Sequence, residues 1–228
     1  MRKPVKRKYV SRVRSEQASG TRARILAAAQ KLFGDRSYAA TPISTIAQEA
    51  GVSPETIYAT FGSKRELLAQ MIAAAIAGEE EAVPMADRAW VAEMRREPGP
   101  DARLRYWISH TCATIERTSA IHAVVRDAVA SEPDLAKLRT EQQRFRFDMQ
   151  SALMQIVAEP GRSRLRVGTA SAAETFWILA SPEVHHLLRN DLGWSAARYQ
   201  AWLTDALLTL LLAPNDTARR LDDRGNPS

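Results

Sequence analysis

Residues 41–66 read TPISTIAQEAGVSPETIYATFGSKRE, and capping residues in this stretch predict three helix starts. Thr41-Pro42 and Ser53-Pro54 each combine a capping hydroxyl with a proline, which suits the first turn of a helix. The run SKRE at 63–66 has the pattern of a capping box, in which serine and glutamate side chains satisfy each other's backbone N–H groups. The stretch therefore predicts two short helices and the start of a third.

The first two of these helices are separated by a short turn that contains Gly51. Glycine can adopt the left-handed conformation that ends a helix sharply. The apolar side chains of the first helix recur on one face, and those of the second helix are one turn apart; we expect these to point inward: Ile43, Ile46, Ala47, Ala50, Ile57 and Phe61. Two short helices joined by a glycine-containing turn form a helix-turn-helix.

Positive charge is concentrated at the same end of the chain. Residues 1–70 contain thirteen Lys and Arg against five Asp and Glu, a net charge of +8, whereas the whole chain carries +6. A basic segment beside a helix-turn-helix is typical of a nucleic-acid-binding protein. We expect residues 1–20, which are basic and polar, to be a disordered arm that contacts phosphates or the minor groove.

The pieces TRARILAAAQKLF, TPISTIAQEAGVSPETIYATF and GSKRELL, with the spacing between them, resemble the DNA-binding domain of the TetR (tetracycline-repressor) family of bacterial transcription regulators. The resemblance runs from Thr21 to about Gly78. It implies a dimeric, ligand-responsive regulator, most simply a repressor, that occupies a palindromic operator in double-stranded DNA and has a small-molecule effector. We place the TetR-type helix-turn-helix domain at residues 21–80, with its first helix beginning at about Arg22.

The expected DNA contacts divide into two kinds. Hydroxyls, a lysine and a helix N-terminus suit phosphates, and the resemblance places Thr41, Tyr58 and Lys64 at backbone-contacting positions. The N-terminal part of a recognition helix enters the major groove, where its side chains reach base edges. The full set of expected DNA-binding residues is Thr41, Ser53, Pro54, Glu55, Thr56, Tyr58, Ala59, Thr60 and Lys64.

The rest of the chain is predicted to be all-α, because no alternating strand pattern bounded by turns occurs. We expect a three-helix DNA-binding domain, a helical effector-binding and dimerisation domain at 81–213, and a polar tail at 214–228. Within the second domain, helices are expected at about 86–97, 101–117, 120–131, 134–158, 170–190 and 195–213, separated mainly by Pro and Gly.

The resemblance also implies an effector site and a dimer interface in this second domain. Its polar, aromatic and Met residues are candidates for contact with a small molecule: Trp90, Met94, Trp107, His110, Thr111, His122, Arg126, Met149 and Trp177. The last two helices of such regulators pair as a four-helix bundle, and a helix that is apolar nearly all round needs a partner. The expected interface is Phe176, Leu187, Leu188, Trp202, Leu203, Leu207, Leu210 and Leu211.

Composition and motifs argue against other classes of protein. The single cysteine, Cys112, excludes a disulfide framework within the chain. The sequence contains no run of 18 apolar residues, so no membrane span is predicted. The competing class is a helical-bundle enzyme or metal protein, which would need two Glu-x-x-His sets, and only the run EVHH at 183–186 supplies one. We therefore expect no enzyme, no cofactor and no metal, and a cytoplasmic location.

Overall fold

The computed structural model describes residues 5–78, 83–129, 133–158 and 164–214, and within these ranges the regular elements are helices with one isolated bridge, Leu165 to Leu212. The chain divides into two compact units. The first comprises Met1–Glu81 and Arg117–Gln142, and the second comprises Ala82–Glu116 and Gln143–Ser228. The all-α prediction is confirmed.

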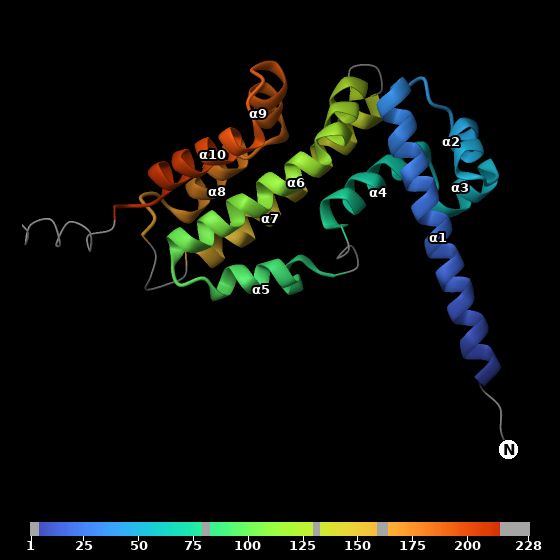
Figure 1. Ribbon diagram of the computed structural model, residues 1–228, viewed down its shortest axis with the longest axis horizontal. Coiled ribbons are helices and arrows are strands. Elements are labelled where there is room, and N and C mark those ends of the chain that lie inside the picture. The colour runs from blue at the N-terminus through green and yellow to red at the C-terminus, as the bar shows by residue number, and fades with distance from the viewer. Residues whose placement is uncertain (1–4, 79–82, 130–132, 159–163, 215–228) are drawn as a thin grey trace, which may run out of the picture. The chain divides into compact units, whose positions relative to one another are not determined.

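The first unit is built from four N-terminal helices and parts of two later ones. Helix α1 spans Val5–Arg36, α2 Ile43–Ala50, α3 Pro54–Phe61 and α4 Lys64–Ala77. Their apolar faces form one core with parts of α6 (Pro100–Val129) and α7 (Pro133–Val157). The apolar positions expected to face inward in α2 and α3 are all buried. In Figure 1, α2 and α3 lie beside the C-terminal half of α1.

Helix α1 begins earlier than the sequence suggested. Residues 1–20 were expected to be disordered and the helix to begin near Arg22, whereas α1 starts at Val5; residues 1–4 lie outside the described part. Lysine, arginine, glutamate and glutamine are good helix formers, and one glycine costs only about 1 kcal/mol. Because residues from Ile25 onward already fix the helix by packing, extending it toward the N-terminus needs no new nucleation.

The second unit contains α5, Ala89–Arg96, which follows a short 3₁₀ turn, η2, at Met85–Asp87. It also contains α8 (Thr169–Leu179), α9 (Pro182–His186), the π-helical turn η3 (Leu187–Asp191) and α10 (Ala196–Leu211). Helices α6, Pro100–Val129, and α7, Pro133–Val157, contribute residues to both units. The polar tail predicted at 214–228 lies outside the described residues apart from residue 214.

Two helix boundaries in this region were predicted wrongly. Two helices were expected at 101–117 and 120–131, but α6 is continuous because neither proline nor glycine occurs between its ends. One helix was expected at 170–190, but the backbone restarts at Ser181, whose Oγ accepts from the Val184 N–H at 3.1 Å, with Pro182 in the first turn. This is the same Ser-Pro start that begins α3.

None of the described helices is long and apolar enough to cross a bilayer.

Candidate functional site

The turn between α2 and α3 has the conformation that its sequence predicts. Gly51 is left-handed, with φ 65° and ψ 41°, and its N–H points back to the carbonyls that end α2. Ser53 caps α3, since its Oγ accepts from the Thr56 N–H at 3.3 Å. Ser63 caps α4 in the same way, accepting from the Glu66 N–H at 3.1 Å. The local capping chemistry thus fixes the start of α3 and of the helix that follows it.

Helix α3 presents a polar outer face. Its inward residues, Ile57 and Phe61, are buried, whereas the hydroxyl-bearing Tyr58 is 52% exposed. The other predicted contacts on this element are either exposed or half-buried: Ser53, Pro54, Glu55, Thr56, Ala59 and Thr60. Because Thr60 Oγ1 donates to the Thr56 carbonyl at 2.7 Å, that side chain offers its methyl group and an acceptor oxygen to a partner.

Glu55 is the one acid on this face, and its surroundings favour the charged form. Its own backbone N–H and the Ser53 hydroxyl hydrogen-bond to the carboxylate and lower its pKa. Glu55 also lies in the first turn of α3, where the helix dipole stabilises negative charge. The structure therefore gives this carboxylate a reason to be present that does not depend on reading a base.

Thr41 is wrongly predicted as a phosphate contact. The side chain is completely buried, and its hydroxyl lies 2.7 Å from the Ser37 carbonyl and 3.3 Å from that of Leu32. Nor does it cap α2, whose N-cap is Pro42 without a side-chain bond. The loop between α1 and α2 turns back on itself, and the threonine hydroxyl satisfies carbonyls left over at the end of α1.

Lys64 lies at the start of α4 and is half-buried. Its Nζ donates to the Tyr38 carbonyl at 2.6 Å and lies 4.0 Å from the centre of the Tyr38 ring. Tyr38 in turn packs on Phe33, with ring centres 5.1 Å apart. The lysine therefore fastens α4 to the loop after α1, and its role toward phosphate stays a prediction.

The predicted effector residues fall into both units. In the second unit, Trp90 stacks on His110 with ring centres 4.0 Å apart, and Trp107 stacks on Phe176 at 3.8 Å. Met94 is fully buried, while Thr111, Met149 and Trp177 are half-buried. His122 and Arg126 lie on the part of α6 that belongs to the first unit.

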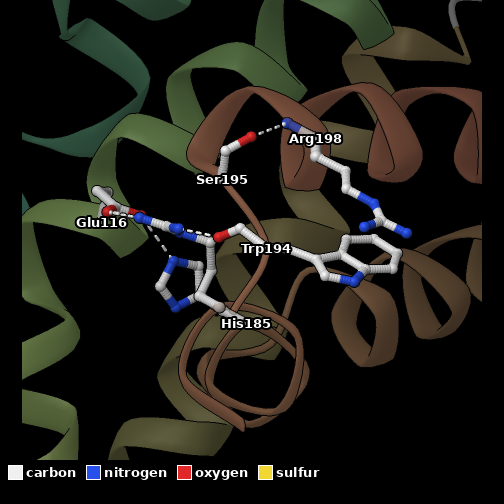
Figure 2. Close-up of polar contacts among 6 residues, drawn as sticks. Glu116, His185, Trp194, Ser195 and Arg198 are labelled. Carbon is white, nitrogen blue, oxygen red and sulfur yellow. Dashed lines mark hydrogen bonds and ion pairs between the residues drawn. The ribbon is translucent and has the colours of Figure 1, made fainter. Parts of the chain in front are cut away.

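An ion-pair cluster joins α6 to the segment around η3 (Figure 2). Arg189 donates to both oxygens of Glu116, at 2.6 and 3.2 Å, and also to the Trp194 carbonyl. His185, which is 3% exposed, lies 2.9 Å from the same carboxylate. The Arg189 guanidinium, aided by His185, lowers the Glu116 pKa to about 2, so this carboxylate remains charged.

The loop after this cluster is also held by a cap and a ring. Ser195 Oγ accepts from the Arg198 N–H at 3.2 Å, which starts α10. The Arg198 guanidinium lies 4.1 Å from the centre of a Trp194 ring, and Figure 2 shows the two side chains face to face. The turn from η3 into α10 is therefore fixed at both of its ends.

A half-buried charge, Arg146, lies on α7. Arg146 donates from Nη1 to the Trp177 carbonyl at 2.8 Å and from Nε and Nη2 to Gln143 Oε1, at 3.2 and 3.0 Å. Its guanidinium lies 4.7 Å from the centre of a Trp177 ring. Burial lowers the Arg146 pKa to about 10. Cys112 is buried nearby in the same core, and burial raises the pKa of its thiol to about 12, which leaves it unreactive.

The sequence model of the family described as "Bacterial regulatory proteins, tetR family" matches residues 25–71, which run from the C-terminal part of α1 through α2 and α3 into α4. The chain carries a TetR-family DNA-binding domain. No curated protein matches this chain in sequence. The matched segment includes the Gly51 turn, the Ser53 cap and the exposed face of α3.

Solved structures resemble this chain over nearly their whole length. NalD, the secondary repressor of the MexAB-OprM efflux pump in Pseudomonas aeruginosa, is 19% identical, with 87% of this chain and 100% of NalD covered and a TM-score of 0.62. FadR of Bacillus subtilis, in complex with stearoyl-CoA, is 16% identical, with 82% and 98% covered and a TM-score of 0.64. A candidate regulator of Saccharomonospora viridis, in complex with choline, is 20% identical, with 86% and 100% covered and a TM-score of 0.63. At this identity the likeness is one of fold.

The predicted dimer interface needs correction. Half of its residues lie in the core of the chain itself, each at most 1% exposed: Phe176, Leu203, Leu207 and Leu211. They form the inward stripes of α8 and α10, so they have no surface to offer a second copy. Leu187 and Leu210 are 54% and 51% exposed, and Leu188 and Trp202 are half-buried.

The sequence reading missed the polar residues of the second unit that the fold brings together. Arg146 and Gln150 were not singled out, although they continue the buried stripe of α7 that includes Leu153, Met154 and Val157. Polar residues on an apolar stripe were the available signal. Glu116, Arg189 and Tyr199 gave none, because their partners lie far away in the sequence.

Proposed function

We propose that this chain is a ligand-responsive repressor that binds a palindromic operator in double-stranded DNA as a homodimer and acts in the cytoplasm. The observation that carries the proposal is the exposed face of α3 within the segment that matches the TetR family. Helices of this kind enter the major groove with their N-terminal residues at base edges. The remaining proposed contacts are Ser53, Pro54, Glu55, Thr56, Tyr58, Ala59, Thr60 and Lys64.

Base readout by this face would differ from the commonest pattern. None of the residues on α3 is Arg, Asn or Gln, the usual bidentate readers of bases. Methyl and methylene groups of Pro54, Ala59 and Thr60 would then contact thymine methyls, and DNA shape would supply further discrimination. The exposed hydroxyl-bearing side chain of Tyr58 would contact a phosphate.

The N-terminal half of α1 is proposed as an additional phosphate contact. It extends beyond α2 and α3 in Figure 1, and residues 1–20 contain seven Lys and Arg. Each phosphate contact adds about 0.9 to the slope of log K against log salt concentration. A chain that lacks residues 1–16 should bind its operator with a shallower slope, and an unchanged slope would remove this segment from the proposal.

Self-association is supported by apolar side chains that remain exposed on the last helices. Ile178, Leu187 and Leu210 are each more than half exposed. A two-fold pair matches a palindromic site whose half-sites are about 34–36 Å apart, or a multiple of that distance. Light scattering should give about twice the 25.3 kDa mass of the chain, and Leu210→Glu should reduce that mass and weaken operator binding together.

The second unit is the proposed site of the effector. FadR and the Saccharomonospora viridis protein, which share the fold, have a ligand in their solved structures. Repression would be relieved if the effector binds the DNA-incompetent state better, and DNA must then weaken effector binding by the same factor.

Selection of binding sites from random DNA, followed by footprinting in the genome of the host, tests the proposal. A palindromic preferred site upstream of regulated genes supports it. Sequence-independent binding alone would contradict it.

A further inference from the structure

Among the described residues of the second unit, five buried side-chain atoms have no hydrogen-bond partner. Two of them, Asp101 Oδ1 and Arg164 Nε, belong to an ion pair. The other three are the Tyr199 hydroxyl on α10, the Trp177 indole nitrogen on α8 and the Gln150 carbonyl oxygen on α7. Tyr199 and Gln150 are 1% and 3% exposed. A buried polar group without a partner costs about 1–3 kcal/mol, so three in one core need an explanation.

The three atoms belong to side chains that surround Arg146. The guanidinium lies against a Trp177 ring, and Gln150 is one helical turn further along α7. Burial raises the Tyr199 pKa, and the nearby charge of Arg146 opposes that rise. The Tyr199 ring also packs edge-on against His185, with ring centres 5.0 Å apart. The three side chains therefore have Arg146 as a common neighbour.

The charges in this region are already balanced. Arg189 is paired with Glu116, and Arg146 interacts with Glu183, whose Oε1 accepts from Gln143 at 3.0 Å. An added anion would face two carboxylates. The Tyr199 O–H and the Trp177 N–H lack a hydrogen-bond acceptor, and the Gln150 carbonyl oxygen lacks a donor.

We propose that this cluster binds the polar head of the effector, an uncharged carbonyl group whose oxygen accepts from Tyr199 and Trp177. A hydroxyl or N–H beside that carbonyl would donate to Gln150. The rest of the ligand would be apolar, because the neighbouring core consists of aromatic and aliphatic side chains. This inference rests on the proposed function, since it assigns the chemistry of the effector in the second unit.

Binding of matched aromatic probes tests the assignment directly. Benzylacetone and hydrocinnamamide carry a neutral carbonyl, butylbenzene carries none, and hydrocinnamate carries a charge. Titration calorimetry on the full chain should show the carbonyl probes binding about tenfold more tightly than butylbenzene, as one or two hydrogen bonds imply. Equal affinities, or tighter binding of hydrocinnamate, would overturn the proposal.

The variants Tyr199→Phe and Trp177→Phe each remove one donor and keep an aromatic ring. Each should reduce the preference for the carbonyl probes severalfold. Tyr106→Phe is the matched control in the same unit, because the Tyr106 hydroxyl bonds to Glu93 and lies outside the cluster. It should leave the preference unchanged, and a loss in this control equal to that in Tyr199→Phe would contradict the assignment.

Thermal melting without ligand separates an unpartnered hydroxyl from one satisfied by buried water. Tyr199→Phe should melt at the same temperature as the natural chain or higher, whereas Tyr106→Phe should melt lower. A drop in Tyr199→Phe as large as that of the control would show that water already satisfies the hydroxyl, and the proposal would fall.

Operator binding, measured in parallel, distinguishes this assignment from the proposed function. If a host extract releases DNA equally from the natural chain and from Tyr199→Phe, and no probe shows the carbonyl preference, the repressor function stands and the assignment falls. If no operator is selected, the function falls, whatever the probes show.

Discussion

Thr41 in the first unit and Tyr199 in the second are both hydroxyl residues with almost no exposed surface. The Thr41 hydroxyl lies within hydrogen-bond distance of two carbonyls at the end of α1, whereas the Tyr199 hydroxyl has no partner. The threonine therefore helps to hold a rigid module that presents α3. The tyrosine hydroxyl forms no hydrogen bond inside the domain that would receive an effector. Burial alone therefore does not distinguish structural from functional polar groups.

The largest expected effect tests the core of the second unit. Phe176→Ala should lower the free energy of unfolding by about 3–5 kcal/mol, because it removes a buried ring that stacks on Trp107. The loss should be independent of protein concentration, since Phe176 is a core residue and not an interface residue. Denaturant unfolding at several protein concentrations measures the loss. A loss that depends on protein concentration would show that Phe176 lies in the dimer interface after all.

Thr41→Val should cost about 1–3 kcal/mol, because carbonyls of Leu32 and Ser37 lose their hydroxyl donor. The size and shape of the side chain hardly change, so the loss reports the hydrogen bond. Chemical denaturation gives the value. If Thr41→Val were as harmless as Tyr199→Phe is expected to be, the contrast between the two hydroxyls would disappear.

Glu116→Gln should destabilise the second unit by about 1 kcal/mol, near the upper end for an ion pair that is 44% exposed on the Glu116 side. The folded pKa of about 2 lies below the ordinary value of 4.5. The stabilisation is therefore complete above pH 4.5 and is lost as pH falls toward 2. Melting curves across that range should converge for the natural and variant chains at the acid end.

Glu55→Ala should have the smallest effect, a slight fall in melting temperature with no change in preferred DNA sequence. The reason is that the Glu55 carboxylate is engaged by its own N–H and by Ser53 at the start of α3. Site selection from random DNA with both proteins measures the preference. A changed base at one position would assign Glu55 to cytosine readout instead.

The sequence by itself determined the helix-turn-helix. Gly51, Ser53 and Ser63 act on backbone groups within a few residues of themselves, and the inward positions of α2 and α3 follow from helical period. Local sequence did not predict the length of α1. Its basic N-terminal half is helical because it continues the half that is fixed by packing. Local chemistry can be read from one segment, whereas the length of a helix depends on what it packs against.

Only the tertiary structure decided which face of α10 is core and which polar groups of the second unit meet. Leucines surround α10 on most sides, so the sequence could not tell the buried Leu203, Leu207 and Leu211 from the exposed Leu210. The pairs Glu116–Arg189 and Arg146–Trp177 join residues far apart in the chain. Such contacts form when helices dock, and no spacing within one helix records the neighbour that it will have.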